Sequence, residues 1–183
     1  MIQNKVPGLY YFFLGEEVGC IGSGHLSRNW DDVSFSSHIN KVVSFDRRGT
    51  CSVITHQFYG RCCSDEFAKE LSMRLSSTSE ELKLSPDDTG VLTDSAQFMD
   101  IVSECTNISV GYYREHTTSE SQDIEYLQKL CKVVCKINWE NLPVMRDPLL
   151  IDDEDDDDVF LEDCAPNQEW ASEYFSYFSI NGK

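Results

Sequence analysis

Residues 9–17, with the sequence LYYFFLGEE, decide the fold that we expect for this chain. An apolar run of six residues is typical of a strand that is buried inside a sheet. Two adjacent carboxylates, Glu16 and Glu17, follow directly after Gly15. Burying two carboxylates at the end of a strand costs free energy unless they bind a metal ion or transfer protons. The stretch therefore predicts an α/β fold with a functional site at the end of this strand.

The rest of the chain predicts further strands and helices. Strands are expected at 41–45 and 51–55, paired as a β-hairpin across a turn that contains Gly49, and at 106–112. Helices are expected at 22–30, 64–75, 94–102 and 121–138, with Ser64 and Ser121 as N-caps, and 76–89 is expected to be a polar loop.

The length and charge of the chain indicate one folded domain with an acidic tail. The sequence has 183 residues, of which 40% are hydrophobic, and its net charge is −17. We expect a domain at 1–146, an acidic linker at 147–163 and an aromatic helix at 164–183. The seven consecutive acids of 152–158 are expected to be solvated, and binding of divalent cations or of a basic partner is the alternative.

Composition also excludes several classes of function. Nucleic-acid binding needs a basic surface, which a net charge of −17 does not favour. Nothing approaches the run of about 18 apolar residues that a membrane span requires. The sequence shows no secretion signal, and its eight cysteines show no paired C-x-x-C spacing. We therefore expect reduced thiols in a cytoplasmic protein.

Candidate chemistry is concentrated at the ends of the expected strands. Glu16 and Glu17 follow the first strand, Asp46 ends the second, Asp94 opens a loop, and His116 follows the strand at 106–112. Sites in α/β sheets gather beyond the carboxyl ends of strands. Carboxylate and imidazole together suit zinc or a similar ion.

Four segments of the sequence together resemble a known enzyme family. The segment at 13–23, FLGEEVGCIGS, resembles the G-E-E-x-G-x-x-G-S motif of the dizinc exopeptidases related to bacterial leucyl aminopeptidase, metallopeptidase family 28. Residues 42–46 resemble its strand that ends in a metal-binding Asp, and 93–98 resemble its S-D-H-x-x-F segment with Ser in place of His. Residues 106–117 resemble its last strand and metal-binding His. The similarity covers about residues 7–140, and the chain resembles proteins of bacterial or phage type.

This resemblance implies a fold and a role for each matching residue. The implied fold is the C-terminal part of a mixed-sheet zinc exopeptidase, with helices on both faces and without the N-terminal strands. Glu16 would be the general base, Glu17 and His116 would bind one zinc ion, and Asp46 would bind a second. Asp94 would lie behind the ligands or on the side of the substrate. The implied reaction removes the N-terminal residue of a peptide.

The resemblance leaves the ligand set incomplete. The family takes a further His and a bridging Asp from segments before the G-E-E motif, and the residues before Glu16 contain neither. We therefore expect weak zinc binding and no peptidase activity from the chain alone. A partner chain that supplies these ligands, or a homo-oligomer, would complete the site. The alternatives are a non-catalytic interaction module with the same fold, a truncated product, and an acidic mimic of nucleic acid that binds a basic partner.

Overall fold

A computed structural model describes residues 1–57, 60–78 and 81–150, and these residues belong to one compact unit. The α-helices are α1 (Ile21–Arg28), α2 (Asp65–Thr78) and α3 (Ile124–Val134). The strands are β1 (Lys41–Arg47), β2 (Ser52–Ile54), β3 (His56–Gln57), β4 (Gly60–Arg61), β5 (Ser85–Asp87), β6 (Glu104–Ser109), β7 (Tyr112–Tyr113) and β8 (Ser121–Gln122). Single turns of 3-10 helix are η1 (Ile2–Asn4), η2 (Glu16–Val18), η3 (Trp30–Asp32), η4 (Ser36–His38) and η5 (Asp94–Phe98). The expected acidic linker and aromatic helix lie almost entirely outside the described residues.

The main sheet has four strands in the order β1-β6-β2-β5. β1 pairs with β6 in parallel, β6 pairs with β2 in antiparallel orientation, and β2 pairs with β5 in parallel. Every residue of β6 is buried, as expected for a strand with neighbours on both sides. The fold is therefore mixed α/β around a mixed sheet, as the sequence predicted, and β1 is an edge strand.

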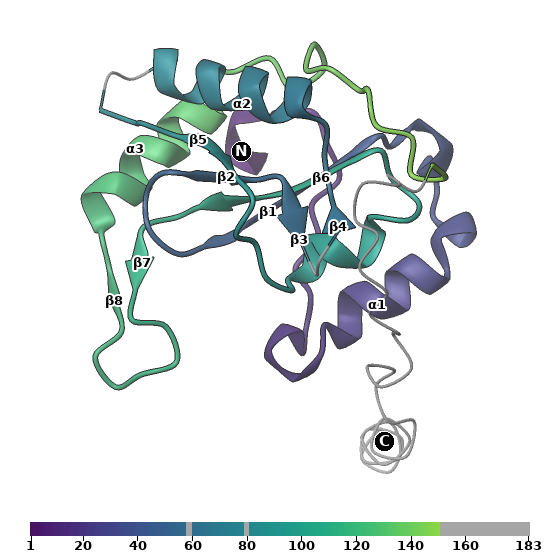
Figure 1. Cartoon of the computed structure of the whole chain (residues 1–183), viewed down its shortest axis with the longest axis horizontal. Helices are drawn as coiled ribbons and strands as arrows, with labels where there is room; N and C mark the ends of the chain where they lie inside the picture. Colours follow the sequence, from purple (N-terminus) through teal and green to yellow (C-terminus); the bar gives the residue numbers. More distant parts are fainter. Residues whose placement is uncertain (58–59, 79–80, 151–183) are drawn as a thin grey trace. The chain divides into compact units, whose positions relative to one another are not determined.

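Two helices cover the sheet through their apolar faces. α2 buries Phe67, Leu71 and Leu75, and it packs against β2, β5 and α3. In Figure 1, α2 and α3 lie next to each other above the strands, and α1 lies below them. The predicted N-cap of α2 is confirmed, because Ser64 Oγ accepts the N–H of Phe67 at 3.2 Å. The predicted cap of α3 was wrong: Asp123, rather than Ser121, accepts the N–H of Tyr126 at 2.9 Å.

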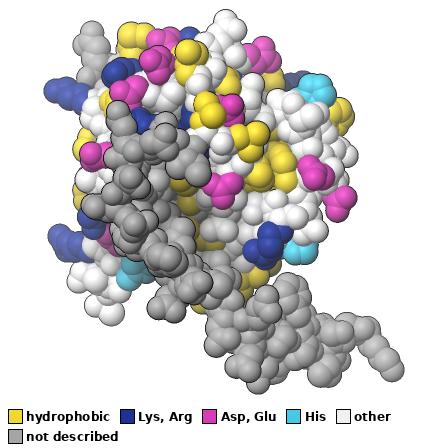
Figure 2. Space-filling view, turned by 45° about the vertical axis from the view of Figure 1, so that its right-hand side comes forward, with side chains coloured by type: hydrophobic (Ala, Val, Ile, Leu, Met, Phe, Trp, Pro, Cys, Tyr) yellow, Lys and Arg dark blue, Asp and Glu magenta, His cyan; other side chains and the backbone are white. Residues whose placement is uncertain are grey.

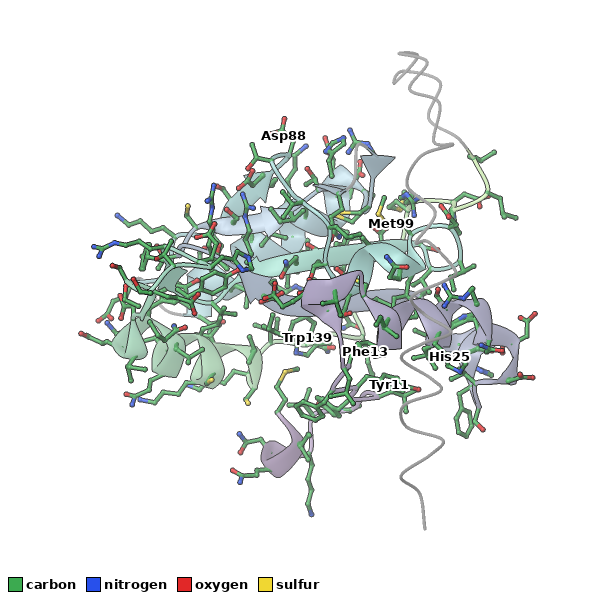
Figure 3. The ribbon with its side chains drawn as sticks, turned by 90° about the horizontal axis from the view of Figure 1, so that it is seen from below. Tyr11, Phe13, His25, Asp88, Met99 and Trp139 are labelled. Carbon is green, nitrogen blue, oxygen red and sulfur yellow. The ribbon has the colours of Figure 1, made fainter. Side chains whose placement is uncertain are left out.

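The segment 9–14 is not the buried strand that its sequence predicted. It forms no strand, and the side chains of Phe12 and Leu14 are 87% and 82% exposed. Only Phe13 packs inward, 6.2 Å from the ring of Phe98, while Tyr11 stacks on Phe13 at 5.6 Å (Figure 3). The physical reason is pairing: a strand needs a neighbouring strand to satisfy its backbone, and the described part of the chain provides none here.

Two further expectations about the sheet were wrong. β1 and β2 are not a hairpin, because β6 lies between them and pairs with both. The expected loop at 76–89 contains β5, which extends the sheet beyond β2. Sequence spacing favoured the local partner, but β6, which comes much later in the chain, took the position between β1 and β2.

The surface of the described residues carries both apolar and charged side chains. Exposed apolar side chains include Leu9, Phe12, Leu14, Phe35 and Val91. On the face drawn in Figure 2, apolar, acidic and basic side chains are intermixed. Among the described residues, no helix is both long and apolar enough to cross a membrane.

Candidate active site

Glu16 and Glu17 lie in η2, a single helical turn that directly follows the exposed segment 9–14. Gly15 precedes this turn with φ of 73°, a left-handed conformation that favours glycine. The chain then folds back on itself, because the N–H of Ile21 donates to the C=O of Gly15 at 3.1 Å. A Cβ at position 15 would lie 3.2 Å from the side chain of Ile21. Glycine is therefore required to place both carboxylates beside the start of α1.

Asp46 occupies the carboxyl end of β1, beside an irregularity in its pairing with β6. Its backbone N–H donates to Asn107 Oδ1 at 2.8 Å, and its carbonyl accepts the hydroxyl of Tyr112 at 3.1 Å. Its carboxylate accepts the hydroxyl of Thr93 at 3.3 Å. β6 and β7 therefore fix the backbone at Asp46, and Thr93 holds its carboxylate at the open edge of the sheet.

Asp94 begins η5 and is tied to α1 and β1 at once. Ser23 Oγ donates to Asp94 Oδ1 at 2.5 Å from the buried face of α1. The N–H of Ser95 donates to Ser44 Oγ at 3.1 Å, which holds the start of η5 against β1. These contacts place Asp94 near Asp46, although the two residues are far apart in the sequence.

His116 reaches the same region from the loop between β7 and β8. Its Nδ1 atom lies 3.5 Å from Glu17 Oε2, and its N–H donates to Glu120 Oε2 at 3.1 Å. The side chains of His116 and Glu17 are 69% and 72% exposed, so this pair lies at the surface. His116 has φ of 59°, a left-handed conformation that is uncommon for a residue other than glycine and is frequent at functional sites.

The five predicted residues lie close enough to affect one another electrostatically. The pKa of Glu16 is raised to about 7, first by partial burial and then by the negative charges of Asp46, Glu17 and Asp94, while His116 opposes the rise. Burial also raises the pKa of Asp46 and of Asp94, and the hydroxyls of Thr93 and Ser23 respectively oppose those rises. Three carboxylates and one imidazole therefore lie near enough to Glu16 to influence its pKa.

The donor types of this cluster suit a divalent cation, but their arrangement is open. Carboxylate oxygens and an imidazole nitrogen are ligands that zinc accepts. Within residues 1–57, 60–78 and 81–150, however, no group of three His, Cys, Asp or Glu side chains is close enough to hold an ion. Glu17 and His116, 3.5 Å apart, are two of the candidate donors in contact.

Sequence reasoning missed the residues that position the carboxylates. Asn107 and Thr93 are buried polar residues that bind Asp46, and Ser23 binds Asp94. Burial also raises the pKa of Tyr112, which binds the carbonyl of Asp46, to about 12. Asn107 carried a usable signal, because a polar amide inside an apolar strand needs a hydrogen-bond partner. Ser23 and Thr93 carried none, since Ser and Thr are common in turns.

Comparison with known proteins gives a likeness only at the level of folds. No protein-family model matches the chain. No curated protein matches it either. Among solved structures, it is similar to PhTET1-12s, a dodecamer in its crystal, with a TM-score of 0.45 and 20% identity over 67% of this chain and 38% of that chain. It is also similar to a TET aminopeptidase from a marine sediment archaeon of the Thaumarchaeota, with a TM-score of 0.48 and 15% identity over 70% of this chain and 39% of that chain.

The chain spans about two fifths of the length of these two structures. Both TM-scores lie below 0.5.

Proposed function

We propose that this chain is a metal-dependent hydrolase of aminopeptidase type, in which Glu16 transfers protons and Glu17, His116 and Asp46 bind zinc. The observation that supports this most is the convergence of residues from four separate segments, including η2, the end of β1 and the start of η5, on one open edge of the sheet. Chance placement of acids at strand ends does not explain why an imidazole joins them from the loop after β7.

Glu16 has the acidity that a general base needs. A carboxylate with a pKa of about 7 is partly ionised at neutral pH, so it can take a proton from water and return it to a leaving amine. The pKa of Glu16 is raised by burial and by neighbouring negative charge. A bound cation would counteract the effect of that negative charge and lower the pKa. Glu16 is therefore proposed as the catalytic residue.

The other carboxylates fit a substrate with a free amino terminus. Asp94 and Asp46 contribute negative charge next to Glu16, and a peptide ammonium group is attracted to such a cluster. Zinc bound by Glu17, His116 and Asp46 would polarise the scissile carbonyl and lower the pKa of bound water. We propose that Asp94 binds on the substrate side, held in place by Ser23.

A complete site needs at least one more donor than the described residues bring together. We propose that another polypeptide supplies it and that the isolated monomer is inactive. The alternative function, a non-catalytic acidic interaction module, is favoured by this same deficit and by the net charge of −17. The two differ in whether zinc confers activity.

The deciding experiment uses the full chain and a panel of aminoacyl p-nitroanilides, with zinc and with a chelator. We expect no hydrolysis where the chain is monomeric, and zinc-dependent hydrolysis only where another polypeptide, a second copy included, completes the site. That hydrolysis should fall by 100-fold or more in Glu16→Gln, because general base catalysis contributes about that much. Asp88→Asn removes one exposed acid from a position well apart from Phe13 in Figure 3 and should change nothing. Equal hydrolysis by wild type and Glu16→Gln would exclude the proposed role. Absence of hydrolysis at every zinc and protein concentration would favour the interaction module.

A further inference from the structure

The adjacent residues Cys62 and Cys63 direct their thiols to the same point in the core. Both side chains are fully buried, and their Sγ atoms lie 3.6 Å and 3.4 Å from one oxygen, that of the Ile54 C=O. Successive side chains of an extended strand point to opposite faces of the sheet, so two adjacent thiols do not normally meet. Here the chain leaves β4 and bends at Cys63 before α2 begins. The two thiols therefore converge, and they hydrogen-bond to each other.

A third buried thiol lies nearby but points elsewhere. The N–H of Cys105 donates to the C=O of Cys62 at 2.7 Å, so these two residues are neighbours. The Sγ atom of Cys105 donates to the C=O of Val102 at 3.5 Å, away from the oxygen that the pair shares. Over the described ranges, the thiols do not form a group of three that could hold a metal ion. The arrangement is therefore that of a dithiol with a separate third thiol.

The two thiols of the pair differ in acidity. Burial raises the pKa of Cys62, but hydrogen bonds with Cys63 and Gln57 and the positive charge of Arg146 outweigh burial, so the pKa is lowered. The hydrogen bond with Cys62, and burial after it, raise the pKa of Cys63. Because the thiolate is the nucleophile in thiol chemistry, Cys62 is the reactive member and Cys63 retains its proton.

We propose that Cys62 and Cys63 are a redox modification site, at which a small peroxide converts the two thiols into a reversible disulfide. The sulfur of Cys62 attacks one oxygen of hydrogen peroxide, the O–O bond breaks, and Cys62 becomes a sulfenic acid while the other oxygen leaves as water. The sulfur of Cys63 then attacks the sulfenic sulfur, the S–O bond breaks, and the oxygen leaves as water with the proton of Cys63. Two thiols are oxidised to one disulfide, and peroxide is reduced to two molecules of water.

The fold can accommodate the loss of both thiol protons. The C=O of Ile54 also accepts the hydroxyl of Thr106 at 2.7 Å, so it keeps a hydrogen-bond partner after the thiols are oxidised. The pair directly follows β4, which is joined to β3 by two residue pairs. A ribbon this short opens locally at a small free-energy cost. Such openings admit a small neutral molecule such as hydrogen peroxide and exclude larger reagents.

Covalent geometry makes this disulfide easy to reduce. Neighbouring Cα atoms are about 3.8 Å apart across a trans peptide bond. Disulfides usually join Cα atoms that are about 4.4–6.8 Å apart, so a bond between adjacent cysteines is strained. Strained disulfides are more oxidising and are the labile ones. The pair should therefore be oxidised while peroxide is present and return to two thiols in mild reductant.

A buried amide connects the pair to the candidate active site. The side chain of Gln57 hydrogen-bonds to Cys62 and donates to Ser95 Oγ at 3.2 Å. Ser95 follows Asp94 at the start of η5, and its N–H donates to Ser44 Oγ at 3.1 Å. Oxidation removes the thiolate that Gln57 contacts, so the hydrogen bonds of this amide must rearrange. The redox state of the pair is thereby communicated to the turn that carries Asp94.

The first test uses the full chain in the presence of a chelator and follows each cysteine by mass spectrometry. Native protein is treated with N-ethylmaleimide, which blocks accessible thiols such as Cys51 and Cys131, then with hydrogen peroxide, and is finally unfolded in iodoacetamide. We expect Cys62 and Cys63 to resist iodoacetamide until dithiothreitol is added, in one peptide that has lost two hydrogen atoms. Cys105 is equally buried and is the internal control, which should react without dithiothreitol.

The same peptide map contains the outcomes that would overturn the inference. One is reaction of both Cys62 and Cys63 with iodoacetamide directly after peroxide treatment. Another is a disulfide that joins Cys62 to Cys105. A third is oxidation of Cys62 to the sulfinic acid without a cross-link. Without peroxide, both thiols of the pair should react with iodoacetamide as soon as the chain unfolds.

Single variants test the order of the two steps. Cys63→Ser removes the second thiol, so Cys62 should stop at the sulfenic acid and be labelled by dimedone once the protein is unfolded. Cys62→Ser removes the nucleophile, so Cys63 should be labelled about tenfold less. Cys105→Ser is the matched control and should form the disulfide as wild type does. Equal dimedone labelling in the first two variants would refute Cys62 as the nucleophile, and the map of the wild-type chain does not depend on how these variants fold.

Nuclear magnetic resonance measures the connection to η5. The amide resonance of Ser95 should shift when the pair is oxidised and return after dithiothreitol is added. The amide of Lys132, an exposed residue of α3, is the control and should not shift. An unchanged Ser95 resonance in protein that carries the disulfide would refute the connection through Gln57.

Discussion

Removing the charge of Glu16 should stabilise the fold above neutral pH. The pKa of Glu16 in the fold is about 7, against an ordinary value of 4.5, mainly because of partial burial and secondly because of Asp46. Between these two values the unfolded chain has lost its proton while the folded chain still holds it. The folded state is therefore penalised progressively as the pH rises from about 4.5 to 7, and the penalty is complete above 7.

The size of this penalty follows from the difference between the two pKa values. For a fully buried carboxyl, such a difference corresponds to about 3 kcal/mol. Glu16 is only half-buried, so solvent screens part of its repulsion, and about 1–2 kcal/mol remains. Glu16→Gln cannot ionise, and it should recover this amount at pH 8 and nothing at pH 4.

The assay is urea unfolding followed by circular dichroism, in the presence of a chelator, at pH 4, 6 and 8. Asp88→Asn is the control, because it removes one exposed acid that is not among the charges acting on Glu16 and lies apart from Phe13 in Figure 3. The reasoning predicts a stabilisation by Glu16→Gln that grows with pH and is absent in the control. An equal effect at pH 4 and pH 8, or destabilisation at pH 8, would refute the claim that repulsion and burial act on Glu16.

Other substitutions test the contacts that hold the site in place. Glu104→Ala should lower the free energy of unfolding by about 3 kcal/mol or more in urea titrations, since this fully buried carboxylate accepts the N–H and hydroxyl of Ser64 and the N–H of Met145. Ser23→Ala should raise the pKa of Asp94 further in a carbon-detected NMR titration, because the Ser23 hydroxyl now opposes the rise; an unchanged pKa would contradict the contact. Asp123→Ala should cost about 1 kcal/mol by loss of the N-cap of α3, whereas Ser121→Ala should cost less than half as much.

Sequence periodicity predicted the helices, because a helix forms its backbone hydrogen bonds within its own segment. α1, α2 and α3 were predicted, because the spacing of Phe67, Leu71 and Leu75 in α2, for example, is set by the helix itself. The order of the strands was not predicted, because it depends on which strand, distant in the sequence, occupies the centre of the sheet. β6 takes the central position, where all six of its residues are buried, including Glu104, whose carboxylate accepts hydrogen bonds from Ser64 and from the segment at 145–146.

The candidate site was predictable in its acids but not in its supports. Residue types predicted Glu16, Asp46 and His116, and the structure places Asp46 and His116 near enough to Glu16 to influence its pKa, while their roles stay predictions. The supports Thr93 and Ser23 depend on where η5 docks, which no local pattern encodes. Tertiary docking also explains the failure at 9–14, since the same apolar run that reads as a buried strand stays irregular when no neighbouring strand is available.

The exposed run at 9–14 and the outer edge of β1 both lack a neighbouring strand among the described residues. Sheet-forming backbone that lacks a partner is an association hazard, and natural proteins cover it, shorten it or place charges on it. Among the described residues, no strand pairs with the outer edge of β1, and the run at 9–14 leaves Phe12 and Leu14 exposed. Covering either surface should therefore lower the tendency of the chain to associate.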